Sequence, residues 1–426
     1  MGPELILLVL AACLAGSLIG TFTGAVPGIH VNTLASIMLV SYPALESFIS
    51  SFTSVSNAPI IVSSLIMSAS VVHSFVDFVP SVFIGAPDPD EALTVLPGHR
   101  LLMQGRGMCA VRAAAIGSVI GASSALLLAI PLQYLMLHGL AERLDFFTIS
   151  ILLFTLTAIV LKERGIGNKV WAALLVVASG VLGLLCMELP IPSAGILGEG
   201  TLLFPMLTGL FGVPALLSSF KNASVPEQRD DGIHPVDHVP GIKGVITGTI
   251  AGWYPGITAT AGASLSSIFL PENRPERFIS VVASIGTVTS IFSLVTLSVS
   301  GSGRSGTVLV IRDIIGNSAS GFCSPEFLLL LLSSAAASFL GYHLTIWVGK
   351  MMCGLTNRID TAVLNKGVLC MIVILVVLLT GPFGLLILAV SVLIGMIPLD
   401  VEGSRVPLSG CLMFPVVVHG LFGQVF

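Results

Sequence analysis

Long apolar stretches, separated by short polar segments, run along the whole chain. A helix rises about 1.5 Å per residue, so roughly 20 apolar residues cross the hydrocarbon core of a bilayer. Stretches of this kind predict membrane helices near residues 4–20, 57–76, 108–137, 146–161, 170–186, 201–219, 278–300, 325–348, 367–380, 383–398 and 408–425. Shorter apolar segments predict half-helices or re-entrant pieces at 33–42, 78–86, 244–252, 258–270 and 305–315. We expect an all-α polytopic membrane protein with roughly 10–12 spans.

A polar, glycine-rich pattern interrupts these apolar stretches twice. Residues 20–36 read GTFTGAVPGIHVNTLAS, and residues 248–264 read GTIAGWYPGITATAGAS. The identical positions, at a constant offset of 228, are Gly20, Thr21, Gly24, Pro27, Gly28, Ile29, Ala35 and Ser36. Such a match without a gap exceeds what chance provides. The sequence therefore predicts two related membrane halves, residues 1–219 and 244–426, joined by a polar loop at 220–243.

Each copy of this pattern combines a helix-packing motif with a helix break. Two glycines four residues apart let another backbone approach closely, and Pro-Gly then ends the helix. In a bilayer, such a break is tolerated where protein or a water-filled cavity covers the freed backbone groups, and paired breaks point to a transporter binding site. The alternative is a pair of proline kinks between packed helices. The predicted substrate-binding residues are Pro27, Gly28, Asn32, Thr33, Ser36, Pro255, Gly256, Thr258, Thr260 and Ser264.

Charge near the two copies predicts the orientation of the halves. The loop after the first copy, residues 41–47, has no Lys or Arg, whereas the loop after the second, residues 271–277, carries Arg274 and Arg277. Because basic loops stay on the cytoplasmic side, the equivalent loops are expected on opposite sides of the membrane. The sequence thus predicts two inverted repeats.

Composition excludes soluble classes of protein. The chain is 54% hydrophobic and 9% charged, and its mean hydropathy is +1.02. Its net charge of −4 gives no indication of a nucleic-acid partner. The seven cysteines lie in apolar segments without metal-ligand spacing, so we expect neither a metal nor a cofactor.

Arg304 is a further candidate for substrate binding. It lies in Gly301-Ser-Gly-Arg-Ser-Gly306, between two apolar stretches. A guanidinium binds a carboxylate through two parallel hydrogen bonds, and glycine-rich backbone can add N–H donors. The alternative is an ordinary loop arginine at the membrane surface.

Acidic and histidine side chains in the first half are candidates for ion coupling, with Na⁺ or H⁺ as the ion. His73 and Asp77 are four residues apart on a predicted membrane helix, where ionisable groups are candidates by default. They could instead pair at a helix end. A second set follows a short apolar segment and consists of Asp88, Asp90 and Glu91. These acidic side chains could equally lie at a solvated helix N-terminus.

Several of these motifs resemble one known family. The chain resembles the large membrane subunit of the tripartite tricarboxylate transporters, the TctA family, in a compact archaeal-like form. The resemblance rests on four segments: the two Pro-Gly copies, Phe83–Gly107 and Phe204–Pro214. It implies a secondary carrier with two repeat halves that takes up carboxylates such as citrate, driven by an ion gradient. It also implies a small membrane subunit and an extracytoplasmic binding protein as partners.

The sequence therefore predicts a multi-pass plasma-membrane transporter of a small anionic substrate, working by alternating access. Two rival functions remain: a translocase for an anionic lipid carrier such as a polyprenyl phosphate, and an intramembrane enzyme. An enzyme is disfavoured, because the chain has no nucleophile–base motif and no clustered metal ligands. A homodimer is one arrangement that the sequence leaves open.

Overall fold

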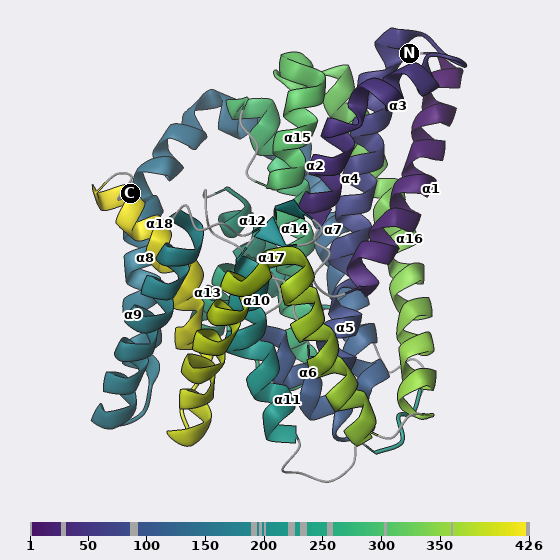
Figure 1. The fold of residues 1–426 in the computed structure, drawn as a ribbon. Coiled ribbons are helices and arrows are strands. Elements are labelled where there is room, and N and C mark those ends of the chain that lie inside the picture. The colour runs from purple at the N-terminus through teal and green to yellow at the C-terminus, as the bar shows by residue number, and fades with distance from the viewer. Residues whose placement is uncertain are drawn as a thin grey trace.

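Helices make up almost all of the computed structural model, and the chain starts at the upper end in Figure 1. The structure describes residues 2–26, 31–85, 93–188, 194–195, 198–199, 202–219, 226–230, 237–253, 259–301, 305–358 and 361–422. Within these ranges, seven helices are long and apolar enough to cross a membrane, by length and composition, and other apolar helices are shorter. The prediction of an all-α polytopic membrane protein is confirmed.

The elements of the first half match the predicted apolar stretches closely. They are α1 (Pro3–Ala25), α2 (Val31–Val40), α3 (Tyr42–Ile49), η1 (Val55–Asn57), α4 (Ala58–Val76), α5 (Phe78–Phe83), α6 (Val95–Leu102), α7 (Gly107–Leu135), η3 (Met136–Leu140), α8 (Ala141–Lys162), α9 (Ile166–Glu188), α10 (Leu203–Leu207), η4 (Thr208–Gly212) and α11 (Val213–Ser219). Between α9 and α10, two short strands that were not predicted, β1 (Ala194–Gly195) and β2 (Gly198–Glu199), pair antiparallel.

The second half begins inside the segment that was expected to be a loop. Its elements are α12 (Val239–Trp253), α13 (Ala259–Phe269), α14 (Pro275–Ser300), α15 (Gly306–Ile315), η5 (Gly316–Ala319), α16 (Pro325–Thr356), α17 (Thr361–Asp400), η6 (Val406–Ser409) and α18 (Gly410–Phe422). Within α17, Gly381 has a φ of 66°, so the helix is kinked between the two spans predicted there.

Both copies of the repeated motif fall where one helix ends and another begins. In the first copy α1 ends at Ala25 and α2 begins at Val31, and in the second α12 ends at Trp253 and α13 begins at Ala259. The Pro-Gly pairs themselves lie outside the described residues. The half-helices predicted at 33–42, 244–252 and 258–270 are present as α2, α12 and α13.

Each half contains a helix pair that packs through a stripe of glycines. A Cβ added to each of these glycines would lie within 3.1 Å of an atom of the neighbouring helix, so the glycines make the close approach possible. The pairs in the first half, α1 on α4, are Gly16–Leu65, Gly20–Ala69 and Gly24–His73. The pairs in the second half, α12 on α14, are Gly244–Val281, Gly248–Ile285 and Gly252–Thr289. Both stripes therefore hold two helices parallel in the same register.

The two helix pairs run in opposite directions through the molecule. Gln133, near the end of α7, contacts Ser298 near the end of α14 and Cys323 just before α16. The ends of α7 and α14 and the start of α16 therefore lie together, at the upper end. Gly349 of α16 packs on Met108 of α7, so α16 runs back toward the lower end. Figure 1 shows α1 and α4 descending beside α16. They are thus antiparallel to α12 and α14.

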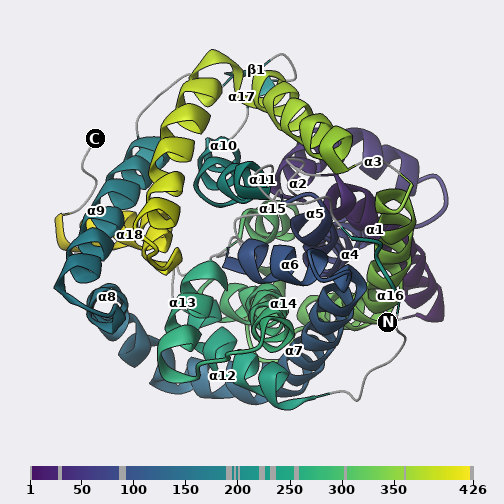
Figure 2. The same ribbon diagram turned by 90° about the horizontal axis from the view of Figure 1, so that it is seen from below.

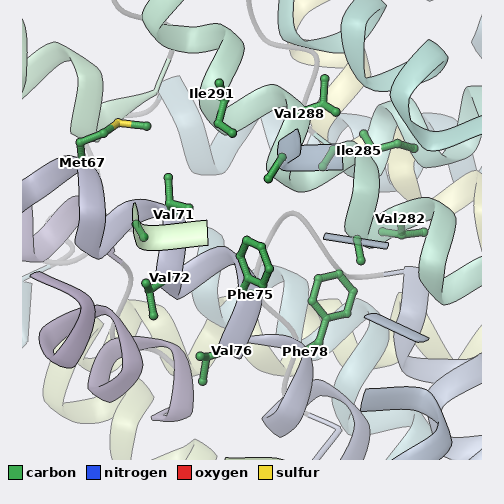
Figure 3. Packing of buried hydrophobic residues seen from close by; sticks show 14 of the residues in the cluster. Met67, Val71, Val72, Phe75, Val76, Phe78, Val282, Ile285, Val288 and Ile291 are labelled. Carbon is green, nitrogen blue, oxygen red and sulfur yellow. The ribbon is translucent and has the colours of Figure 1, made fainter. Parts of the chain in front are cut away.

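Helices α4 and α14 form the centre of the bundle. They are the most buried of the seven long helices, and their facing side chains belong to one apolar cluster. Figure 3 shows Phe75 of α4 and Phe78 of α5 in this cluster together with Val282 and Ile285 of α14. Figure 2 shows α8, α9 and α18 on the side of the molecule opposite to α1 and α16. Large apolar side chains remain exposed on the outside, as contact with lipid requires.

Part of the expected solvated loop between the halves is docked onto the helices. Gln228 is buried, and its Oε1 accepts a hydrogen bond from the N–H of Gly107 at 2.9 Å. Its backbone N–H donates to Oδ1 of Asn357 at 2.7 Å. Arg112 also binds Asp230 through two nitrogens. These contacts tie the connection to the start of α7 and the end of α16.

Candidate functional site

The first motif copy contacts the second half of the chain through Asn32. Its Oδ1 accepts a hydrogen bond from the N–H of Thr307, at the start of α15, with a distance of 3.0 Å. A Cβ added to Gly306 would lie 2.7 Å from Cγ of Asn32, so a larger residue there would displace the Asn32 side chain. The residues that directly follow Arg304 therefore meet the first copy of the motif.

A line of polar side chains on α4 continues from this contact. Ser70 and Thr307 bring their hydroxyl oxygens to 3.3 Å, and Nδ1 of His73 lies 3.0 Å from Oγ1 of Thr23 on α1. Nε2 of His73 and Oδ2 of Asp77 are 3.9 Å apart, and both side chains are buried. Four elements, α1, α2, α4 and α15, thus contribute polar groups to one region.

The second motif copy contacts a different element. Thr260 and Ser264 of α13 are both fully buried. Oγ of Ser264 lies 3.0 Å from Oγ of Ser409 in η6, and also 3.0 Å from the carbonyl oxygen of Thr260. The second copy is therefore packed against the turn that precedes α18.

Arg405, just before η6, is a buried cation that the sequence analysis did not select. Its Nη1 donates to the carbonyl oxygen of Phe211 in η4 at 3.3 Å. Burial, and next the charge of Arg405, lower the pKa of His99 below its usual value. A weak repeat could have drawn attention to it: residues 199–202 read EGTL and residues 402–405 read EGSR. The arginine stands where the first half has an apolar residue.

A family model describes most of this chain. The model of the tripartite tricarboxylate transporter TctA family matches residues 10–410. The chain belongs to the tripartite tricarboxylate transporter TctA family. An uncharacterized protein of Methanocaldococcus jannaschii, MJ1079, is 28% identical to it over 312 residues, which are 71% of this chain and 72% of the relative. No solved structure was found to match the chain.

Membership of the TctA family confirms the resemblance seen in the sequence motifs. The chain is a component of a tricarboxylate transporter and a multi-pass membrane protein. The TctA family itself is a family of transporter subunits rather than of enzymes. Members of the TctA family work with a small membrane subunit and an extracytoplasmic binding protein. Among the described residues, no three or more His, Cys, Asp or Glu side chains come together to hold a metal ion.

Only some predicted site residues of this TctA-family chain can be located. Asn32, Thr260, Ser264, His73 and Asp77 have the contacts given above. Thr33 and Ser36 lie in α2, but their side chains are outside the described part of the chain. The others fall outside the described residues altogether: Pro27, Gly28, Asp88, Asp90, Glu91, Pro255, Gly256, Thr258 and Arg304. Their roles stay predictions.

Proposed function

We propose that this TctA-family chain is an ion-coupled secondary transporter in the plasma membrane that takes up a carboxylate substrate by alternating access. Na⁺ or H⁺ is the coupling ion. The substrate site lies between the two Pro-Gly breaks, one from each half. The single observation that carries this proposal is the hydrogen bond between Asn32 and the N-terminus of α15, because it joins the first break to the second half.

The two halves, in this proposal, are inverted repeats. The glycine stripes support it: α1 packs on α4 as α12 packs on α14, residue for residue, while the two pairs run antiparallel. The halves also exchange contacts, since α7 packs on α14 and α16 packs on α4. Inverted repeats that cross-pack in this way provide a fixed centre around which one part can rock against another.

Ion coupling is assigned to the first half. The glycine stripes match His73 with Thr289, so the buried pair of His73 and Asp77 has an uncharged counterpart. Placing an ionisable group at membrane depth costs free energy. Such groups are therefore candidates for a function that outweighs this cost. The cation therefore binds near α4, and the anionic substrate nearer to the second half.

The rival function, translocation of an anionic lipid carrier, is not favoured by the family. Carboxylate uptake is tested with the purified chain in liposomes, alone and with a small membrane subunit and binding protein. Labelled citrate, succinate and other carboxylates are offered under an imposed Na⁺ or H⁺ gradient. We expect uptake of at least one carboxylate that collapses when the gradient is dissipated. Absence of uptake under every gradient and subunit combination would contradict the proposal.

A further inference from the structure

Among the described residues, one whole edge of the Arg405 guanidinium has no partner. The residue is 7% exposed, and within this part of the chain neither Nε nor Nη2, both buried, meets a hydrogen-bond acceptor. Nη1 donates to the carbonyl oxygen of Phe211. An unpaired buried charge is strongly unfavourable, so a fold that retains one is expected to use it.

The unpartnered edge has the geometry that a carboxylate requires. The N–H bonds of Nε and Nη2 point in parallel, which suits the two oxygens of one carboxylate. This protein contains an occupied example: Arg112 donates from Nε and Nη2 to Asp230, with distances of 2.6 to 3.1 Å. Among the described residues, no carboxylate takes the corresponding place at Arg405.

Arg405 lies one turn away from a contact of the second motif copy. It directly precedes η6, whose Ser409 contacts Ser264 of α13. On its other side lies Phe211, in the π-helical element η4. Burial lowers the pKa of the Arg405 guanidinium to about 10, so it keeps its proton at neutral pH. A permanent positive charge is thus held between η4 and η6, the element that contacts α13.

We propose that Arg405 is an anion contact of the transport site, and that its Nε and Nη2 edge receives a carboxylate group of the substrate. The inference rests on the proposed function, since the carboxylate is that of the transported molecule. In the weak repeat of EGTL and EGSR, Leu202 takes the position of Arg405, so within this pair of segments the charge belongs to the second half alone.

The test replaces Arg405 with the residue that the first half carries. Purified wild-type protein and the variants Arg405→Leu and Arg405→Lys are compared by citrate and succinate uptake and by melting temperature with and without each acid. We expect Arg405→Leu to melt at or above the wild-type temperature, because an apolar residue replaces an unpaired buried charge. Its apparent affinity should fall about tenfold to a hundredfold, since charge-assisted hydrogen bonds are lost. Arg405→Lys should be intermediate.

Controls separate this inference from the proposed function. Arg312→Leu removes an exposed arginine that pairs with Asp313, and should leave affinity unchanged. Wild-type affinity in Arg405→Leu would overturn the role of Arg405 while carboxylate transport stands. If Arg405→Leu does not fold, unchanged affinity in Arg405→Lys overturns it instead. Stabilisation of the wild type by inorganic phosphate, but by neither acid, would overturn the carboxylate assignment.

Discussion

Asn32 is one of the residues that join the two halves at the candidate site. A side-chain amide is neutral, so it can hold the N–H of Thr307 in the first turn of α15 without repelling an anion. An aspartate would also accept this hydrogen bond, and its charge would suit the helix N-terminus. The two side chains therefore differ in their effect on a carboxylate substrate, rather than in their ability to hold α15.

Substitutions of Asn32 separate holding α15 from binding substrate. Asn32→Ala should lower stability by about 1 kcal/mol through the lost hydrogen bond. Asn32→Asp should keep the stability and yet weaken carboxylate uptake more strongly, because it adds a negative charge beside the substrate. Melting temperatures and uptake rates measure the two effects. Asn357→Ala, which removes two hydrogen bonds to Gln228 at the end of α16, serves as control. Wild-type uptake by Asn32→Asp would remove Asn32 from the site.

His73 and Asp77 are expected to act on coupling rather than on substrate binding. Asp77→Asn keeps the shape of the side chain and removes its charge. We expect exchange of substrate across the liposome membrane to persist while gradient-driven uptake is lost, because the coupling ion no longer binds. Counterflow and gradient-driven uptake are measured side by side. Gradient-driven uptake at the wild-type rate would show that the pair is structural.

At the scale of elements, the glycine stripes set how closely the helices of each half approach. A stripe of small residues replaces the hydrophobic driving force that helices lack in lipid, because it allows close backbone packing. The stripe of α1 extends to Gly16, beyond the repeated motif, where a Cβ would press on the carbonyl oxygen of Leu65. A substitution at Gly16 is therefore no neutral control for one within the motif.

The close packing at the glycine stripes predicts how substitutions there change the stability of the protein. In Gly20→Ala the new Cβ would meet the carbonyl oxygen of Ala69, so α1 must move away from α4 and stability should fall by about 1–3 kcal/mol. Gly286→Ala on α14 is the matched control, because no atom lies within 4 Å of its Cβ position. That control should melt at the wild-type temperature or slightly above it. Equal melting of both variants would contradict close packing at the stripe.

Much of the fold was predictable from the apolar pattern, because a span must be about 20 apolar residues long wherever it lies. The same pattern predicted two spans, 367–380 and 383–398, on either side of the kink at Gly381 in α17. The hairpin of β1 and β2 and the docking of Gln228 were not predictable, since they depend on partners distant in sequence. For the same reason the sequence pointed to Asn32 but could not identify its contact with Thr307. Arg405 was missed because a single arginine beside an apolar stretch resembles an ordinary interfacial residue.

In the molecule as a whole, buried ionisable groups of opposite kind belong to the two ends of the sequence. Buried His73 and Asp77 belong to the first half, and buried Arg405 belongs to the second. The reciprocal packing of α7 on α14 and of α16 on α4 keeps the halves together. A coupling cation and an anionic substrate can thus bind on opposite halves of one cross-packed core.

Uptake by Gly28→Val and Gly256→Val decides whether the two Pro-Gly breaks form one transport site. A Cβ at either break should strain the backbone or occupy substrate space, at about 1–2 kcal/mol or more per site. We predict that each variant inserts and melts as a folded protein but takes up no carboxylate. Gly354→Val, where the Cβ position on α16 is open, should transport normally. Wild-type uptake by both break variants would contradict the account.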